Sequence, residues 1–320
     1  MTKVPILFIT YTRIDTAIQV WEEIKKAQPE KLYFYSNRPP ADKPEQIEKN
    51  NQIRLWVKEI DWPCQLKTFF REEPVDVYTS TRGAIDWLFD NEETGMVLED
   101  DTVPSQALFS FHEQMLEKFK DDKRIWYIGA SNLYPEYNPN GTDYLFSRMR
   151  AATQAWAGWR DRWQKQDLNP DIIKMKEKGI YKTFFFGSKK AGDMWDNTHP
   201  NMPEVIERTH LWDFVLILNE MANDGLHVIP AKNLMTNVGA VGAHFKTADT
   251  RTMFNEREKS TEYVIKNEPL FIYEDVDYDE YFFKHYYAGL LGWKYQLKKI
   301  IKKVAVTIVG EEMFNKYRGR

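Results

Sequence analysis

The chain of 320 residues carries 44 Lys and Arg against 48 Asp and Glu, which gives a formal net charge of -4. This slight acidity excludes a protein that coats nucleic acid, so no nucleic-acid partner is expected. A content of 42% hydrophobic and 15% aromatic residues excludes wholesale disorder. The single cysteine, Cys64, excludes a disulfide scaffold. No apolar run approaches the ~18–20 residues of a membrane span, so a cytoplasmic protein is expected.

Short apolar runs alternate with helical patterns through the first 130 residues. Strands are expected over 6–9, 31–35, 66–70, 95–98 and 125–128, and helices over 14–27, 44–56, 80–91 and 104–119. Such alternation is typical of βαβ units. The sequence therefore predicts an α/β fold with a mainly parallel sheet.

The pattern loosens beyond about Asp143. An aromatic-rich patch covers 156–163, a helix is expected over 212–223 and a strand over 226–229, and a loop of small residues follows over 237–244. The last 70 residues differ in kind, because they contain a run without acids in which Lys284, Lys294, Lys298, Lys299, Lys302 and Lys303 accumulate. Wound as a helix, this run is amphipathic and basic. Two interpretations remain open: the helix packs on the body, or it makes peripheral contact with an anionic membrane.

Three carboxylates, Glu99, Asp100 and Asp101, directly follow the apolar run 95–98. In open α/β sheets, ligands bind outside the carboxyl ends of the strands. Adjacent carboxylates repel one another unless a cation or hydrogen-bond donors offset them. Mn²⁺ or Mg²⁺, held by one or two carboxylates and by substrate phosphates, fits this pattern. The alternative is a strand end whose acids are solvated or cap the helix that follows.

Other catalytic motifs are missing from the sequence. It contains no Gly-x-x-x-x-Gly-Lys-[Ser/Thr] phosphate loop, no Gly-x-Gly-x-x-Gly after the first strand, no His-Glu-x-x-His pair and no Gly-x-Ser-x-Gly elbow. A dinucleotide-dependent oxidoreductase and an acyl hydrolase of these types are therefore not expected.

Several segments resemble one family when taken in order. They are 10–13 (TYTR), 70–73 (FREE), 98–105 (LEDDTVPS), 156–163 (WAGWRDRW), 212–214 (WDF) and 230–239 (PAKNLMTNVG). This set resembles the GT-A-fold glycosyltransferases, and within them the bacterial polysaccharide nucleotide-diphospho-sugar transferases. A more distant likeness is to N-acetylglucosaminyltransferases that use Glu-Asp-Asp. The resemblance covers roughly residues 5–244.

The resemblance implies a GT-A (Rossmann-like) sheet flanked by helices. It places one GT-A domain over 1–250, with a nucleotide-sugar half over 1–130 and an acceptor half over 131–250. Residues 251–320 would form a C-terminal helical extension that contains the basic helix.

The resemblance also implies how the donor is bound. Asp101 would be the direct ligand of Mn²⁺ or Mg²⁺ on the donor diphosphate, with Asp100 nearer the ribose. Arg13 and Arg71 would contact the nucleotide or its phosphates, because guanidinium groups match phosphate oxygens. Ordinary surface ion pairs are the alternative for both arginines. Asn37 stands where relatives commonly carry an acid that reads the base, so the nucleotide is left open, with a UDP-sugar expected first.

The second half would supply the remaining groups. Asp213 matches the catalytic base, with Glu207 in reserve, although an Asp in the first turn of a helix is an equally simple explanation. His244 resembles a late histidine that completes the metal shell, but the acid that often precedes it is missing. Trp156 and Trp159 would stack on sugar faces. Core packing is the alternative for these tryptophans.

These features together predict transfer of a sugar from a nucleotide-diphosphate donor to a hydroxyl of a glycan or lipid-linked glycan, with inversion as the expected course. A sugar-1-phosphate nucleotidyltransferase is one alternative, but it calls for a glycine-rich loop after the first strand, and residues 10–13 contain no glycine. A catalytically silent glycan-binding module is the other.

Overall fold

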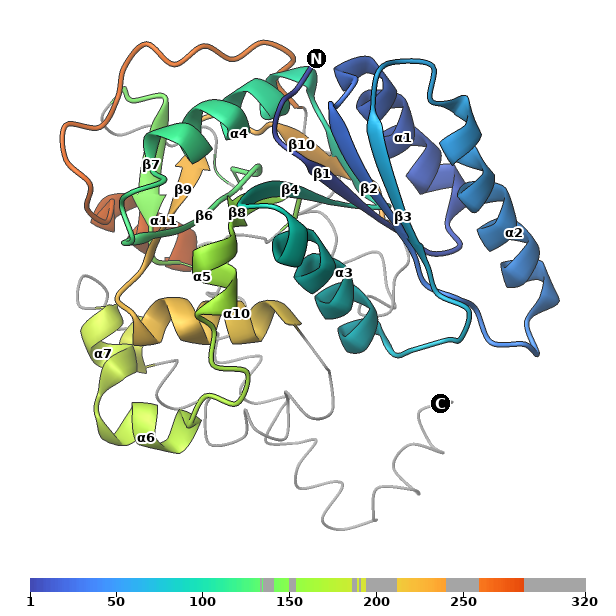
Figure 1. Ribbon diagram of the computed structural model, residues 1–320. Helices are drawn as coiled ribbons and strands as arrows, with labels where there is room; N and C mark the ends of the chain where they lie inside the picture. Colours follow the sequence, from blue (N-terminus) through green and yellow to red (C-terminus); the bar gives the residue numbers. More distant parts are fainter. Residues whose placement is uncertain are drawn as a thin grey trace, which may run out of the picture.

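A computed structural model of the chain describes residues 1–132, 134, 141–149, 154–185, 189, 191–193, 212–239 and 259–284 (Figure 1). Its main sheet contains β1 (Ile6–Thr10), β2 (Lys31–Ser36), β3 (Gln65–Phe70), β4 (Thr94–Glu99), β6 (Ile125–Ile128), β7 (Tyr144–Ser147), β8 (Trp156–Trp159) and β9 (Leu226–Pro230). The strand order is β3-β2-β1-β4-β8-β6-β9-β7. Only β8 and β7 run against the other six strands of this sheet.

Helices cover both faces of the sheet. They are α1 (Ile14–Ala27), α2 (Pro44–Leu55), α3 (Val77–Asn91), α4 (Gln106–Lys118), α5 (Arg160–Gln164), α6 (Ile172–Glu177), α7 (Ile180–Phe184), α10 (Trp212–Ala222) and α11 (Val276–Phe282), with a 3-10 turn at Trp56–Glu59. Ile6 and Phe8 of β1 pack with α1, α2 and α4, whereas Leu7 and Ile9 pack with α3 and α10. This alternation follows from the two-residue period of a strand. The predicted fold class, a mainly parallel α/β sheet flanked by helices, is confirmed.

The first four strands of the chain lie next to one another in the sheet. Because β3, β2, β1 and β4 are mutually parallel, their carboxyl ends share one edge. Five predicted site residues come within three positions after these ends: Arg13, Asn37, Arg71, Asp100 and Asp101. The order of the strands therefore brings separate parts of the sequence to a common edge.

Helix α1 fixes the segment that carries Arg13. Its buried residues recur at helical spacing, at Ala17, Val20, Trp21, Ile24 and Ala27. The helix ends where Gln28 takes the left-handed conformation, with φ of 47°. Arg13 stands immediately before the first turn, and its backbone oxygen accepts a hydrogen bond from Ala17 N at 2.9 Å.

A second, two-stranded sheet joins the halves of the chain. It pairs β5 (Thr102–Pro104) with β10 (Met235–Asn237) in antiparallel register, so that Asn237 lies opposite Thr102. The sequence predicts a helix from Pro104, but α4 begins only at Gln106, because the residues of β5 pair with β10. This pairing brings residues 235–239 next to the acids that follow β4.

Residues 259–284, which belong to the predicted C-terminal extension, lie against the body. Asp275 N donates to Phe146 O at 2.9 Å, and Ala231 N donates to the Tyr263 hydroxyl at 3.0 Å. The first of these bonds satisfies a carbonyl of β7, the edge strand of the main sheet. Covering an edge in this way protects it from pairing with other chains.

The basic helix expected beyond Lys284 lies outside the described residues. Within the part of the chain that the structure describes, no helix combines the length and apolar character needed to cross a membrane.

Candidate active site

The acids at the end of β4 form a tight turn, which we call the acidic turn (Glu99–Asp101). The buried Thr102 hydroxyl donates to Glu99 O and accepts from Glu99 N, both at 3.0 Å. Thr102 is also the first residue of β5, which β10 holds in place. The backbone of the acidic turn is therefore held from both ends.

Arg13 joins the two aspartates of the acidic turn. Its Nη1 donates to Asp101 Oδ2 at 2.8 Å, and its Nη2 donates to Asp100 Oδ1. The contact arises because β1 and β4 are neighbours, with Ile9 opposite Glu99. The two carboxylates raise the pKa of Arg13 above its ordinary value, so the guanidinium is fully charged.

The acidic turn holds more carboxyl groups than one guanidinium can offset. Burial raises the pKa of Asp100 to about 6, although the charge of Arg13 acts in the opposite direction. Burial, followed by the charges of Asp101 and Asp100, raises the pKa of Glu99 to about 8. Asp100 is 4% exposed, and its buried Oδ2 has no hydrogen-bond partner within the described part of the chain. A further cation would relieve this imbalance.

The donor set of the acidic turn fits Mn²⁺ or Mg²⁺. These ions are typically held by one or two carboxylates together with waters and substrate phosphates. The unpartnered oxygen of Asp100 and the carboxylate of Asp101 supply such a pair. In the described ranges no group of three or more His, Cys, Asp and Glu side chains is gathered as a metal cage. His244, the other predicted ligand, lies outside the described residues.

The chain that follows β10 passes directly over Asp101. Val238 N donates to Asp101 O at 2.9 Å, and Gly239 N donates to Asn237 Oδ1 at 2.8 Å. A Cβ added at Gly239 would lie 2.3 Å from Asp101 Oδ2 and 3.0 Å from its Cγ. Only glycine allows this approach without moving the carboxylate. The sequence alone does not predict this contact, since it depends on the pairing of β5 with β10.

We expect Gly239→Ala to weaken Mn²⁺ binding about tenfold or more, because the methyl group would push the Asp101 carboxylate out of position. Isothermal titration with MnCl₂ measures this affinity. Gly179→Ala is the matched control: it also replaces a glycine and adds strain at a φ of +68°, but no atom lies within 4 Å of the new Cβ. Equal Mn²⁺ affinities for both variants would contradict the role given to Gly239.

Arg71 is held in place at the end of β3. Its Nε donates to the Tyr35 hydroxyl at 2.6 Å, and its guanidinium lies 5.0 Å from the centre of the Phe69 ring. A Cβ at Gly83, in the middle of α3, would approach Arg71 Nη2 to 2.8 Å. The glycine therefore makes room for the guanidinium, at a cost to α3 of about 0.5–1 kcal/mol relative to alanine. The surface ion pair considered for Arg71 is not formed among the described residues.

The Asn37 amide is engaged within the protein. Its Nδ2 donates to Val75 O at 2.9 Å, and its Oδ1 accepts from Arg38 N at 2.9 Å. Asn37 is 8% exposed. In this structure the side chain therefore holds the loop before α3 rather than presenting its amide to a ligand.

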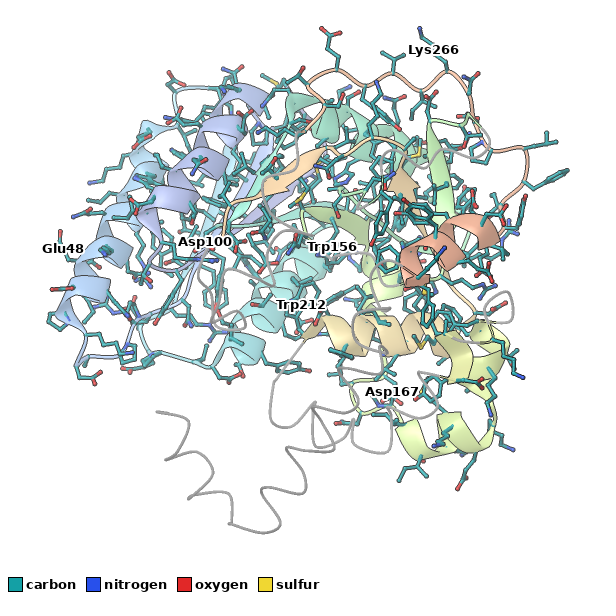
Figure 2. The ribbon with its side chains drawn as sticks, turned by 180° about the vertical axis from the view of Figure 1, so that it is seen from behind. Glu48, Asp100, Trp156, Asp167, Trp212 and Lys266 are labelled. Atoms are coloured by element: carbon teal, nitrogen blue, oxygen red, sulfur yellow. The ribbon has the colours of Figure 1, made fainter. Side chains whose placement is uncertain are left out.

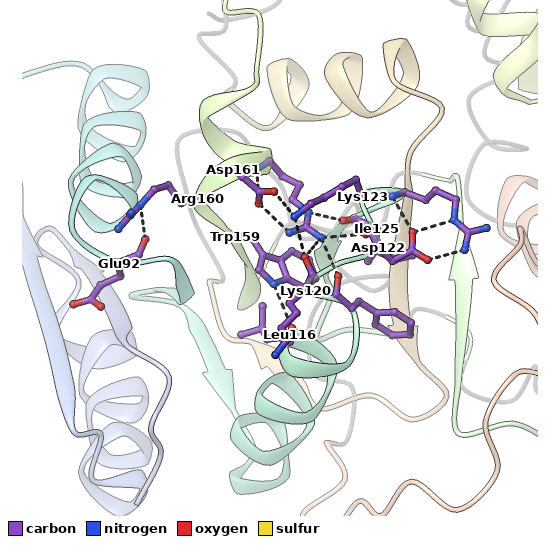
Figure 3. Close-up of polar contacts among 12 residues, drawn as sticks. Glu92, Leu116, Lys120, Asp122, Lys123, Ile125, Trp159, Arg160 and Asp161 are labelled. Atoms are coloured by element: carbon purple, nitrogen blue, oxygen red, sulfur yellow. Dashed lines mark hydrogen bonds and ion pairs between the residues drawn. The ribbon is translucent and has the colours of Figure 1, made fainter.

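Trp156 and Trp159 are core residues, which corrects the expectation that they stack on sugars. They are 2% and 4% exposed, so neither presents a free ring face. Trp159 Nε1 donates to Leu116 O at 3.3 Å (Figure 3). The Arg162 guanidinium lies 4.1 Å from the centre of the Trp159 ring. Trp163, at 3% exposed, is core as well.

Arg162 fixes the position of the segment 159–163 (WRDRW) against the neighbouring elements. It is 4% exposed and donates to four backbone carbonyls around the end of α4, those of Phe119, Lys120, Asp122 and Ile125 (Figure 3). These carbonyls lie in the connection from the end of α4 to the first residue of β6, so the bonds hold this connection in place. The segment thus ties β8 and α5 to α4 and β6.

Asp213 lies in the first turn of α10. The preceding Trp212 stacks on Trp156 with ring centres 6.1 Å apart, which anchors the start of this helix (Figure 2). The charge of Asp213 is one of the causes that raise the pKa of Glu99. The start of α10 therefore lies close enough for its carboxylate to act on the acidic turn. Glu207, the reserve candidate, lies outside the described residues.

No family model matches the chain, and no curated protein matches it either. Among solved structures, the mannosyltransferase PcManGT from Pyrobaculum calidifontis, in complex with GDP-Man and Mn²⁺, is 12% identical with a TM-score of 0.35, over 50% of this chain and 44% of that one. The glycosyltransferase GlyE of Streptococcus pneumoniae is 14% identical with a TM-score of 0.32, over 63% and 43%. A UDP-glucose pyrophosphorylase complexed with UDP-glucose is 12% identical with a TM-score of 0.26, over 56% and 80%.

The three structures named here are thus two glycosyltransferases and one nucleotidyltransferase. The match spans less than half of the length of the first two. The function of this protein must therefore be inferred from the residues of the site itself.

Proposed function

We propose that this protein is a metal-dependent glycosyltransferase that moves a sugar from a nucleotide-diphosphate donor to a hydroxyl of a glycan or lipid-linked glycan. The observation that carries the proposal is the acidic turn, where Asp100 and Asp101 meet Arg13 at the carboxyl edge of four parallel strands. A buried carboxylate oxygen without a partner calls for a cation there. Ligands of open α/β sheets bind at this edge.

Asp101, with Asp100 beside it, would hold Mn²⁺ or Mg²⁺, and His244 is proposed as a further ligand. When bound, the ion supplies a Lewis acid that stabilises the diphosphate leaving group. Arg13 and Arg71 would bind phosphate oxygens of the donor, because the two residues follow β1 and β3, which end at the same carboxyl edge of the sheet. The preset position of Arg71 lowers the entropy lost on binding.

Asp213 is proposed as the base that removes the proton of the acceptor hydroxyl. A base must lie within hydrogen-bond reach of that proton, and the stacking of Trp212 on Trp156 fixes the turn that carries the carboxylate. Direct attack by the hydroxyl on the anomeric carbon would invert its configuration. Asp213 then holds the proton while the nucleoside diphosphate departs.

The experiment that tests the proposal compares two products. Incubated with Mn²⁺, a panel of nucleotide sugars headed by UDP-sugars and glycan acceptors, the protein is expected to release nucleoside diphosphate. A nucleotidyltransferase would instead join labelled pyrophosphate to the nucleotidyl group of the nucleotide sugar, which forms labelled nucleoside triphosphate and releases the sugar-1-phosphate. Formation of labelled nucleoside triphosphate without release of nucleoside diphosphate, or no turnover of any donor, would contradict the proposed function.

A further inference from the structure

Arg13 spans the two carboxylates that the proposed function assigns to a metal ion. One nitrogen of its guanidinium contacts Asp101 Oδ2, and the other contacts Asp100 Oδ1. We infer that Arg13 is the resident counter-ion of the acidic turn, which competes with the divalent cation until a diphosphate draws the guanidinium away. This inference rests on the proposed function, because it presumes that the acidic turn binds a cation.

The geometry makes the two cations compete. The guanidinium already occupies one oxygen of each carboxylate, so an ion held by both carboxylates would either lie beside this positive charge or take its place. Asp100 and Asp101 are largely buried, with side chains 5% and 17% exposed, so water screens little of the repulsion between two neighbouring cations. The ion therefore binds the protein alone less tightly than two such carboxylates would otherwise allow.

Arg13 is the most exposed of the three side chains in these ion pairs. Its side chain is 35% exposed, far more than those of its two partners. Phosphate oxygens offer the same paired acceptors as the two carboxylates. A nucleoside diphosphate at this edge would thus give the guanidinium a new partner at the moment when the ion takes its place. Binding of the cation and of the diphosphate would then favour each other, as linkage requires.

An opposite role for Arg13 makes the opposite prediction. If the guanidinium only orients the carboxylates as ligands, its loss would weaken binding of the ion, as the loss of such outer partners typically does. The sign of the change in Mn²⁺ affinity therefore decides between a competitor and an orienting partner.

The experiment measures Mn²⁺ binding without a donor, by titration calorimetry of the full chain. Arg13→Met is expected to bind Mn²⁺ about tenfold or more tightly than the unaltered protein. Arg13→Lys keeps the positive charge and is expected to bind Mn²⁺ about as weakly as the unaltered protein. Arg38→Met is the matched control, because Arg38 also follows a strand at this edge but contacts Asn51, at 3.1 Å, and not the acidic turn.

A second readout separates competition from a general disturbance. With Mn²⁺ present, Arg13→Met is expected to bind UDP about tenfold more weakly, so the two affinities move in opposite directions. Weaker or unchanged Mn²⁺ binding by Arg13→Met would overturn the inference and leave the proposed function standing. If neither the unaltered protein nor Arg13→Met bound Mn²⁺, with UDP present or without it, both the inference and the proposed function would be contradicted.

Discussion

Asp101→Asn should lower kcat/KM by about 100- to 1,000-fold, which corresponds to about 3–4 kcal/mol of transition-state stabilisation. Asn keeps the size of the side chain but removes the charge that would bind the ion. Thr102 and β10 hold the backbone of the acidic turn, so we expect this backbone to keep its position in Asp101→Asn. The loss should therefore appear as lost metal binding rather than lost folding.

Steady-state kinetics at several Mn²⁺ concentrations test this expectation. The apparent Mn²⁺ affinity of Asp101→Asn should fall together with its turnover, while its melting temperature should stay near that of the unaltered protein. Asp15→Asn, in the exposed first turn of α1, is the control, and its kinetics should not change. Full turnover by Asp101→Asn would remove Asp101 from the catalytic site.

Asp213→Asn should lower kcat by about 100- to 10,000-fold with little change in the donor KM, because general-base catalysis contributes on that scale. Asp213→Glu, which keeps a carboxylate, should retain more activity than Asp213→Asn.

A purely structural role for Asp213 makes a different prediction. An acid in the first turn of a helix stabilises that helix by about 0.3–1 kcal/mol through the helix dipole. If that is its only role, Asp213→Asn would lower the free energy of unfolding by this amount and leave kcat unchanged. Thermal unfolding measured beside the kinetics distinguishes the two roles.

Much of the first 130 residues could be predicted from the sequence. The strand at 125–128 and the helix at 14–27 fall where the apolar pattern places them, because both bury a regular apolar face. The acidic turn could be located as well, since three acids directly after an apolar strand are typical of a ligand site at the carboxyl edge of a sheet. Its contact with Arg13 follows once β1 and β4 are known to be neighbours.

The rest of the site depends on contacts between distant segments. β5 and β10 are three residues long, too short for a periodic pattern, and they form because they pair with each other. The role of Gly239 follows from that pairing alone. Trp156 and Trp159 illustrate the opposite difficulty, because an indole that could stack on a sugar has the same sequence pattern as one that fills a core.

The most direct test is a crystal structure with Mn²⁺ and a nucleoside diphosphate, in which anomalous scattering locates the metal. We expect manganese at the acidic turn, bonded to the Asp101 carboxylate and to oxygens of the diphosphate, with the Arg13 guanidinium moved onto a phosphate. A nucleotide bound at this edge without manganese beside Asp101, or manganese bound elsewhere, would contradict the account.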